Sequence, residues 1–109
     1  MTETPSELDM RNMRAAADEA ASLLRTLGNP DRLLLLCQLS QGERSVGELE
    51  SLLGLRQPSL SQQLAVLRNE NLVQTRREGK RIFYSIAEPR LLVLLGTLYS
   101  LYCPAAAAP

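Results

Sequence analysis

The segment from residue 45 to residue 84 constrains the fold most strongly, because its glycines and prolines divide it into short elements in a fixed order. Ser45 and Glu48 have the spacing of a capping box, which predicts the start of a short helix. Gly54 ends this helix, since glycine readily adopts the left-handed conformation that follows many helices. Residues 57–69 predict a second helix with a proline in its first turn. The segment therefore begins with two helices joined by a tight turn.

Two β-rich runs follow the second helix. Residues 72–75 and 81–86 carry the side chains that favour strands. Residues 76–80 between them predict a hairpin loop in which Gly79 supplies a positive φ. A helix, a tight turn, a second helix and a strand–turn–strand are the order of a helix-turn-helix followed by a β-wing.

The rest of the chain predicts three more helices. Residues 8–27 carry apolar side chains at three- and four-residue steps, the period of an amphipathic helix. Residues 29–31, Asn-Pro-Asp, start a second helix that is apolar almost all round over residues 33–39, which predicts a central, buried position before Gly42 closes it. A last, leucine-rich helix occupies residues 89–103. The expected fold is mainly α with a small β-hairpin, in the order α-α-α-α-β-β-α.

The length and composition of the chain indicate how many domains it forms. A chain of 109 residues is one domain by the usual length prior, and we expect residues 8–103 to form it, with residues 1–7 and 104–109 disordered. A core of this size is modest, so pairing with a second copy would add stability. No apolar run approaches the length of a bilayer span, so we expect a cytoplasmic protein with no membrane partner.

Charge is unevenly distributed along the chain. The net charge is zero, with 12 basic and 12 acidic residues. Residues 54–84 hold six basic and two acidic side chains, so this segment is +4 and the remainder is −4. Such an asymmetry favours one surface that faces a polyanion, although an ordinary solvated hairpin with arginines would also produce it.

Helical geometry at 100° per residue divides residues 57–69 into two faces. Leu60, Leu64 and Leu67 fall within about 60° of one another and are expected to dock on the domain. Gln62 lies directly opposite, and a glutamine can pair with adenine through two hydrogen bonds in the major groove. Small and amide-bearing side chains on this face would let the helix approach base edges. The candidate DNA-binding residues of this helix are Gln57, Ser59, Ser61, Gln62 and Gln63, of which Gln63 lies nearer the apolar boundary and is expected to contact phosphate.

A polar face can also be simply exposed to solvent. A helix of that kind usually carries glutamate and lysine, whereas residues 57–69 contain one charged residue. This difference favours base reading. The basic side chains expected to meet phosphates or the adjacent minor groove are Arg68, Arg76, Arg77, Lys80 and Arg81.

With these residues in view, the chain resembles the ArsR (SmtB/ArsR) family of winged-helix transcriptional repressors. The resemblance lies in LLRTLGNPDRLLLLCQLSQGERSVGELE, in LRQPSLSQQLAVLRNENLVQTRREGKRIFYSI and in the leucine-rich last helix. It implies a homodimer that pairs through its first and last helices. It also implies binding to pseudopalindromic double-stranded operator DNA and release of that DNA by an inducer.

The chain departs from the metal-sensing members of the family. Their thiolate-rich site has cysteines where this chain reads Ser45-Val46-Gly47, and their other common site uses histidines, of which this chain has none. Two cysteines without imidazole make a poor transition-metal site. We therefore expect neither a bound metal nor another cofactor.

The resemblance is strongest to the sulfide- and persulfide-responsive branch, the BigR/SqrR/HlyU-like regulators. These carry one cysteine in the second helix and one near the end of the last helix, as Cys37 and Cys103 do here. The resemblance implies that reactive sulfur species (persulfides or polysulfides) cross-link the pair and release DNA. Three alternatives stay open: two buried apolar cysteines, a response to peroxide or another electrophile, and the absence of any inducer.

Two other classes of protein fit less well. Hydrolytic or transfer enzymes need a base beside a nucleophile, and this chain has no histidine and no glycine-rich phosphate loop, so we expect no enzyme activity. A winged helix that binds protein would carry a hydrophobic or charged outward face in place of Ser59, Ser61 and Gln62.

Overall fold

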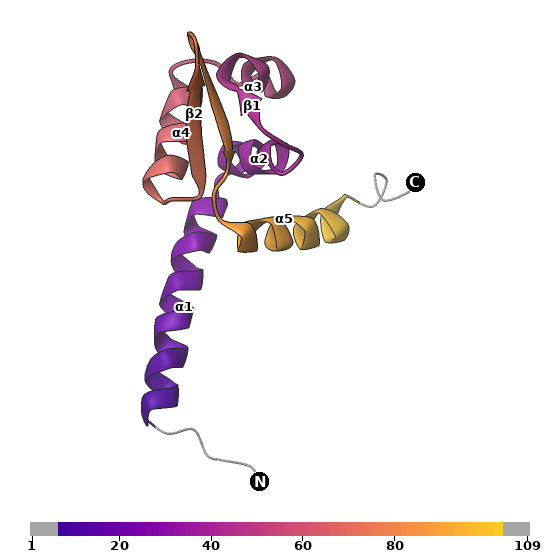
Figure 1. Cartoon of the computed structure of the whole chain (residues 1–109). Coiled ribbons are helices and arrows are strands. Elements are labelled where there is room, and N and C mark those ends of the chain that lie inside the picture. The colour runs from indigo at the N-terminus through magenta and orange to yellow at the C-terminus, as the bar shows by residue number, and fades with distance from the viewer. Residues whose placement is uncertain (1–6, 104–109) are drawn as a thin grey trace.

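The computed structural model describes residues 7–103, with side chains from residue 9 onward (Figure 1). The expected mainly helical order is confirmed, and a two-residue strand is added before the third helix. The sequence predictions for residues 1–6 and 104–109 lie outside the described residues, whereas Glu7, expected to be disordered, begins the first helix. The elements are α1 (Glu7–Leu27), α2 (Pro30–Leu39), β1 (Arg44–Ser45), α3 (Val46–Leu53), α4 (Ser59–Asn69), β2 (Val73–Glu78), β3 (Arg81–Ile86) and α5 (Pro89–Tyr102).

The sheet is antiparallel, with strand order β1-β3-β2. The prediction that residues 76–80 form a loop was wrong, because Arg76, Arg77 and Glu78 continue β2 and pair with β3. Only Gly79 and Lys80 remain as the turn, with Gly79 at the expected positive φ of 63°. Charged residues suit this strand because it lies at the edge of the sheet, where both faces reach solvent. The two-residue β1 is too short to show a periodicity.

Local capping places the helices as the sequence indicates. The side chain of Asn29 accepts a hydrogen bond from the backbone N–H of Arg32 at 3.1 Å and caps α2. The capping box before α3 is complete: Ser45 Oγ accepts from the Glu48 N–H at 3.2 Å, and the Glu48 carboxylate accepts from the Ser45 N–H at 2.8 Å. Gly54 ends α3 in the left-handed conformation, with φ at 69°.

The core is built almost entirely from leucine and lies among α2, α3, α4, α5 and the sheet. The central position of α2 is confirmed for Leu35, Leu36 and Leu39. The expected burial does not extend to Leu34, which is 48% exposed. The largest fully buried side chains are Leu35, Leu36, Leu49, Leu60, Leu64, Leu67, Leu91 and Leu95.

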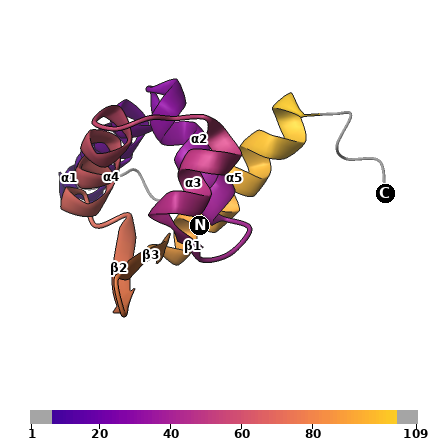
Figure 2. The same ribbon diagram turned by 90° about the horizontal axis from the view of Figure 1, so that it is seen from above.

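The first and last helices extend beyond this core. Figure 1 shows α1 projecting away from the domain, and the view from above shows α5 beside α2 and running out on another side (Figure 2). The described side chains of α1 from Asp9 to Ala20 are all exposed, including Met10 and Met13. On α5, Val93 and Leu101 are exposed as well. Among the described residues, no helix is both long enough and apolar enough to span a membrane.

Two adjacent leucines of α2 provide a matched test of the core. We expect Leu35→Ala to lower the free energy of unfolding by about 3 kcal/mol, because it leaves a cavity in a well-packed interior. Leu34→Ala should cost under about 1 kcal/mol, because that side chain is already half exposed. Urea unfolding at one fixed protein concentration measures both values. Equal losses would contradict this description of the core.

Candidate nucleic-acid interface

The outward face of α4 is polar, as the sequence predicts. Leu60, Leu64 and Leu67 are buried and hold the opposite face of the helix against the core. Ser61 and Gln62 are exposed, and the side chain of Gln62 makes no hydrogen bond within residues 7–103. The docking of the three leucines therefore turns an uncharged, amide-bearing surface toward solvent.

The other three candidate residues have different positions. Gln57 does not belong to the helix, because Pro58 is its N-cap and a residue before proline is disfavoured in helical conformation. Its side-chain oxygen instead accepts from the backbone N–H of Ser61 at 3.2 Å and from the Ser61 hydroxyl, which fixes the first turn of α4. Ser59 and Gln63 are half-buried on the flank of α4.

Arg76 is held by carboxylates. Its guanidinium donates two hydrogen bonds to Glu43, both at 2.8 Å, and one to Glu78 at 3.1 Å, and it lies 4.6 Å from the centre of the Phe83 ring. The hydrogen bond from Arg76 is the main reason that the pKa of Glu43 is lowered, and the same bonds raise the pKa of Arg76. The positive charge of Arg76 is therefore largely neutralised within the protein.

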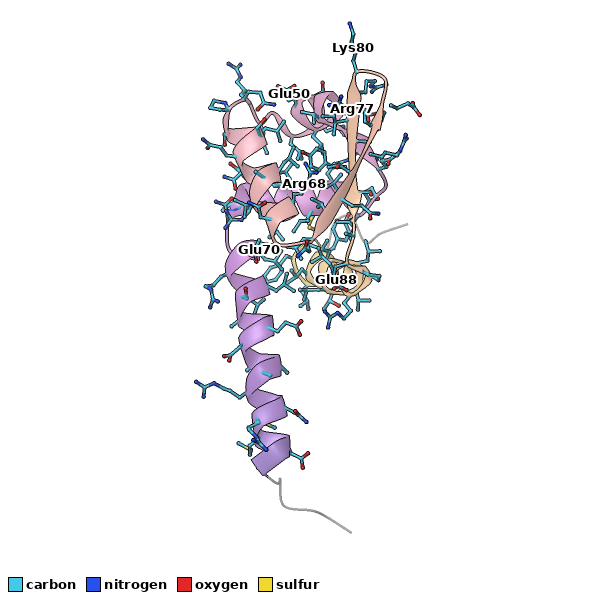
Figure 3. All side chains as sticks on the ribbon, turned by 60° about the vertical axis from the view of Figure 1, so that its left-hand side comes forward. Glu50, Arg68, Glu70, Arg77, Lys80 and Glu88 are labelled. Atoms are coloured by element: carbon cyan, nitrogen blue, oxygen red, sulfur yellow. The ribbon has the colours of Figure 1, made fainter. Side chains whose placement is uncertain are left out.

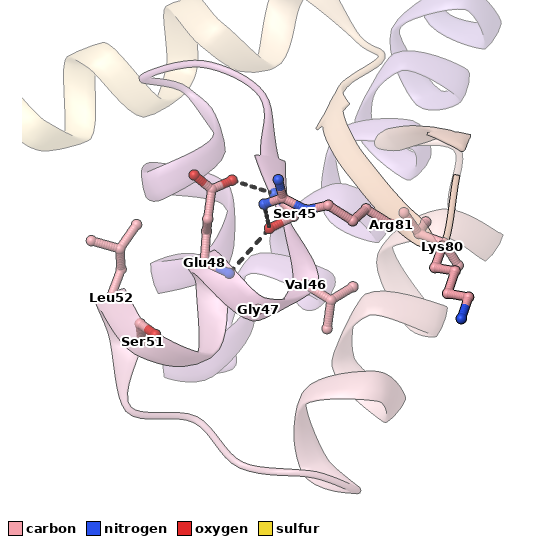
Figure 4. Close-up of a pocket in the computed structure, with 9 residues that line it drawn as sticks. Ser45, Val46, Gly47, Glu48, Ser51, Leu52, Lys80 and Arg81 are labelled. Carbon is pink, nitrogen blue, oxygen red and sulfur yellow. Dashed lines mark hydrogen bonds between the residues drawn. The ribbon is translucent and has the colours of Figure 1, made fainter. Parts of the chain in front are cut away.

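Arg81 joins the wing to α3. It donates to Ser45 Oγ at 3.1 Å, across a groove of about 660 Å³ between the start of α3 and the hairpin (Figure 4). The pKa of Glu48, which completes the capping box, is lowered first by the backbone hydrogen bond from Ser45 and to a smaller extent by Arg81. Arg81 therefore fixes the orientation of the wing, while the amine of Lys80 extends away from Ser45.

Four of the five predicted cations carry no ion pair within the part of the chain that the structure describes: Arg68, Arg77, Lys80 and Arg81, of which Arg81 is engaged by the Ser45 hydroxyl. Lys80 projects from the tip of the hairpin, and Arg77 lies on the same hairpin (Figure 3). The sequence could not distinguish these residues from Arg76, because Glu43 lies 33 positions before Arg76 and no local pattern links the two.

Both cysteines are free thiols, half-buried at Cys37 and exposed at Cys103, and they are not within disulfide distance. Burial raises the pKa of the Cys37 thiol, and the charge of Cys103 raises it further, so the two groups lie near enough to interact electrostatically. Cys37 lines a groove of about 600 Å³ between α2 and α5, with Leu34, Leu92 and Tyr99 among its neighbours. Among residues 7–103, no cluster of three or more histidine, cysteine, aspartate or glutamate side chains could hold a metal ion.

The helix-turn-helix, the outward amide face of α4 and the basic hairpin together define a winged-helix DNA-binding protein. Residues 29–75 match the profile described as "Bacterial regulatory protein, arsR family". The chain is 50% identical over 110 residues to the "Biofilm growth-associated repressor" of Agrobacterium fabrum, covering 94% of each protein. It is 40% identical to the "Transcriptional activator HlyU" of Vibrio cholerae, covering 90% of this chain and 91% of that protein. The chain belongs to the ArsR family of transcriptional regulators.

Solved structures agree with this assignment. The fold superposes with a TM-score of 0.81 on the transcriptional repressor BigR of Xylella fastidiosa, at 49% identity, covering 86% of this chain and 96% of that one. Reduced HlyU of Vibrio cholerae also gives 0.81, at 41% identity and with 85% and 98% coverage. A winged-helix domain from Mycobacterium bovis described as homodimeric gives 0.67, at 30% identity and with 94% and 93% coverage.

The ion pairs of the wing predict unequal contributions to DNA binding. We expect Lys80→Gln to reduce the slope of log affinity against log salt by about 1 for each subunit that binds, because a free cation that meets a phosphate releases about one counterion. The double variant Glu43→Gln/Arg76→Gln removes a neutral pair and should leave the slope unchanged. Fluorescence anisotropy with a duplex that the wild-type protein selects from random-sequence DNA measures both slopes. If the double variant lowers the slope as much as Lys80→Gln, Arg76 contacts phosphate after all.

Proposed function

We propose that this protein is a transcriptional repressor that binds pseudopalindromic double-stranded operator DNA as a homodimer and releases it when reactive sulfur species modify Cys37 and Cys103. The observation that carries the DNA-binding part is the uncharged outward face of α4 beside a hairpin with unpaired cations. The biofilm growth-associated repressors among its relatives support repression in particular.

The uncovered apolar surface of the two terminal helices supports the homodimer. Met13 on α1 is 61% exposed, and Val93 and Leu101 on α5 are 72% and 67% exposed. Exposed apolar side chains gathered on the two terminal helices are typical of an interface. A symmetric pair of subunits would place two α4 helices against two half-sites about one DNA turn apart.

A substitution in the second turn of α5 tests the dimer. We expect Val93→Glu to produce a monomer, because a buried carboxylate without a partner costs several kcal/mol at an interface. Val93→Thr keeps the shape of the side chain without adding a charge and should stay dimeric. Sedimentation equilibrium measures the mass of both variants. A Val93→Glu variant that remains dimeric would show that α5 does not form the interface.

In the proposed DNA complex, Gln62 lies closest to the base edges. Its carboxamide offers one donor group and one acceptor. Adenine presents a matching acceptor, N7, and donor, the N6 amino group, in the major groove. Ser61 is exposed beside it, and its hydroxyl is already engaged by Gln57. Arg68, Arg77 and Lys80 would contact phosphates on either side of this helix.

The proposed switch is thiol chemistry in which a persulfide, R–S–SH, is the oxidant. The thiolate of one cysteine attacks the terminal sulfur of R–S–SH, the S–S bond breaks and the thiolate R–S⁻ leaves, so the protein carries Cys–S–SH. The thiolate of the second cysteine then attacks the sulfur bonded to carbon and expels HS⁻ as the disulfide forms. Two protein thiols are oxidised, and the persulfide is reduced to a thiol and hydrogen sulfide. Retention of further sulfane sulfur would give a polysulfide bridge instead.

The positions of the two thiols link this chemistry to DNA release. Cys103 is the C-cap of α5 and is exposed to a reagent, whereas Cys37 is half-buried on α2 with a raised pKa. We propose that Cys103 reacts first and that Cys37 resolves the product. Because the thiols are beyond disulfide distance, a bridge requires the end of α5 to move toward α2, which would shift the dimer interface and the spacing of the two α4 helices.

A mobility-shift assay with glutathione persulfide tests the switch. We expect the reduced protein to bind its selected duplex, and treatment to lower the affinity at least tenfold. Cys37→Ser and Cys103→Ser variants should bind DNA and retain it after treatment. Intact-mass spectra taken alongside should show either the loss of two hydrogen atoms or additions of sulfur.

Two outcomes would contradict parts of this proposal. Release of DNA from either single variant would exclude the paired-thiol mechanism. Release by hydrogen peroxide with oxygen additions, and none by the persulfide, would identify a peroxide sensor instead.

A further inference from the structure

Arg32 lies where α1, α2 and α4 meet. It is half-buried in the first turn of α2, and its backbone N–H is fixed by the Asn29 cap. Its Nε donates to the backbone carbonyl of Thr26 at 2.7 Å, at the end of α1. Its Nη1 donates to the side-chain oxygen of Gln63 at 3.1 Å, in the middle of α4. One guanidinium therefore connects the first helix to the helix that carries the outward amide face.

This contact determines which end of the Gln63 carboxamide faces outward. A guanidinium carries only hydrogen-bond donors, so the atom of Gln63 that meets Arg32 is necessarily the oxygen. The NH₂ group of Gln63 therefore points away from Arg32. A free glutamine presents either a donor or an acceptor by rotating its amide, whereas Gln63 is restricted to presenting a donor.

A second contact supports the same connection. Thr26 is buried, with 7% of its surface exposed, and its hydroxyl lies 3.3 Å from the Ser22 carbonyl and 3.5 Å from a carboxylate oxygen of Glu70, the C-cap of α4. The last turn of α1 thus contacts the end of α4 directly and its middle through Arg32.

We infer that Arg32 is a positioning residue for DNA recognition: it holds the Gln63 amide so that its N–H donor meets an acceptor atom on the DNA. The inference rests on the proposed DNA-binding function and goes beyond it by assigning Gln63 a fixed hydrogen-bond polarity. The acceptor is a phosphate oxygen or an acceptor on a base edge, such as N7 or O6 of guanine or O4 of thymine.

A double-mutant cycle tests whether Arg32 acts through Gln63. Arg32→Met, Gln63→Met and the double variant are compared with the wild-type protein on the duplex that the wild type selects from random-sequence DNA. We expect each single variant to lose about tenfold in affinity and the double variant to lose about tenfold as well, because both changes remove one contact. A hundredfold loss in the double variant means that the two residues act independently, and would overturn the inference.

A variant that preserves the packing keeps the inference testable if Arg32→Met does not fold. Gln63→Glu keeps an oxygen to accept from Arg32 but has no N–H to offer, so we expect at least a tenfold loss of affinity with no loss of thermal stability. Gln41→Glu, at an exposed position after α2, makes the same change of charge and should bind as the wild type does. Unchanged affinity in Gln63→Glu would overturn the inference.

Two modified sets of duplexes identify the acceptor. In the first set, each base pair is substituted in turn, and the affinities of the wild type and of Gln63→Met are measured. If the acceptor is on a base, Gln63→Met should lose the base preference of the wild type at one base pair in each half-site. In the second set, single phosphates are replaced by uncharged methylphosphonates. If the acceptor is a phosphate, one replacement should lower the affinity of the wild type and leave that of Gln63→Met unchanged. A Gln63→Met profile that matches the wild type in both sets would overturn the inference. If the wild type selects no duplex, the proposed DNA-binding function itself fails.

Discussion

The burial of Leu60, Leu64 and Leu67 determines which face of α4 the molecule presents to solvent. These side chains fill the space beside α2 and the sheet, and their removal from water fixes the rotation of α4 about its own axis. Once that rotation is fixed, Ser61 and Gln62 face outward, and Ser59 and Gln63 lie half-buried on the flank of the helix. The hydrophobic effect does not depend on DNA sequence, yet it sets the direction of the side chains that would read that sequence.

Pairing with acidic and polar side chains distinguishes basic residues of the hairpin that look alike in the sequence. Arg76 and Arg81 are engaged by Glu43, Glu78 and Ser45, so they give the hairpin a defined shape. Lys80 at the tip keeps its charge available. A chain of zero net charge can therefore present a positive edge, because its acidic residues pair with some cations and leave others unpaired.

Local patterns predicted most of the fold. The capping box at Ser45, the left-handed Gly54 and the leucine spacing of α4 each depend on residues a few positions apart, and the structure has all three. Contacts between distant residues were not predictable. The pairs Arg76–Glu43 and Arg32–Gln63 join positions more than 30 residues apart, and only the folded chain brings them together. The extent of β2 was misjudged for a related reason, because charged residues are typical of a loop until the strand is known to lie at an edge.

The edge position of β2 has a consequence for solubility. One side of this strand pairs with β3, and the other has no strand partner in the described part of the chain, so its backbone groups are available to a strand from another molecule. The unpaired charge of Arg77 opposes such an addition, because charged side chains along an edge strand disfavour pairing with another strand. A side chain that suits the hairpin to a polyanion thus also keeps copies of the protein from joining edge to edge. A variant made apolar along β2 would lose this protection even where its fold remained intact.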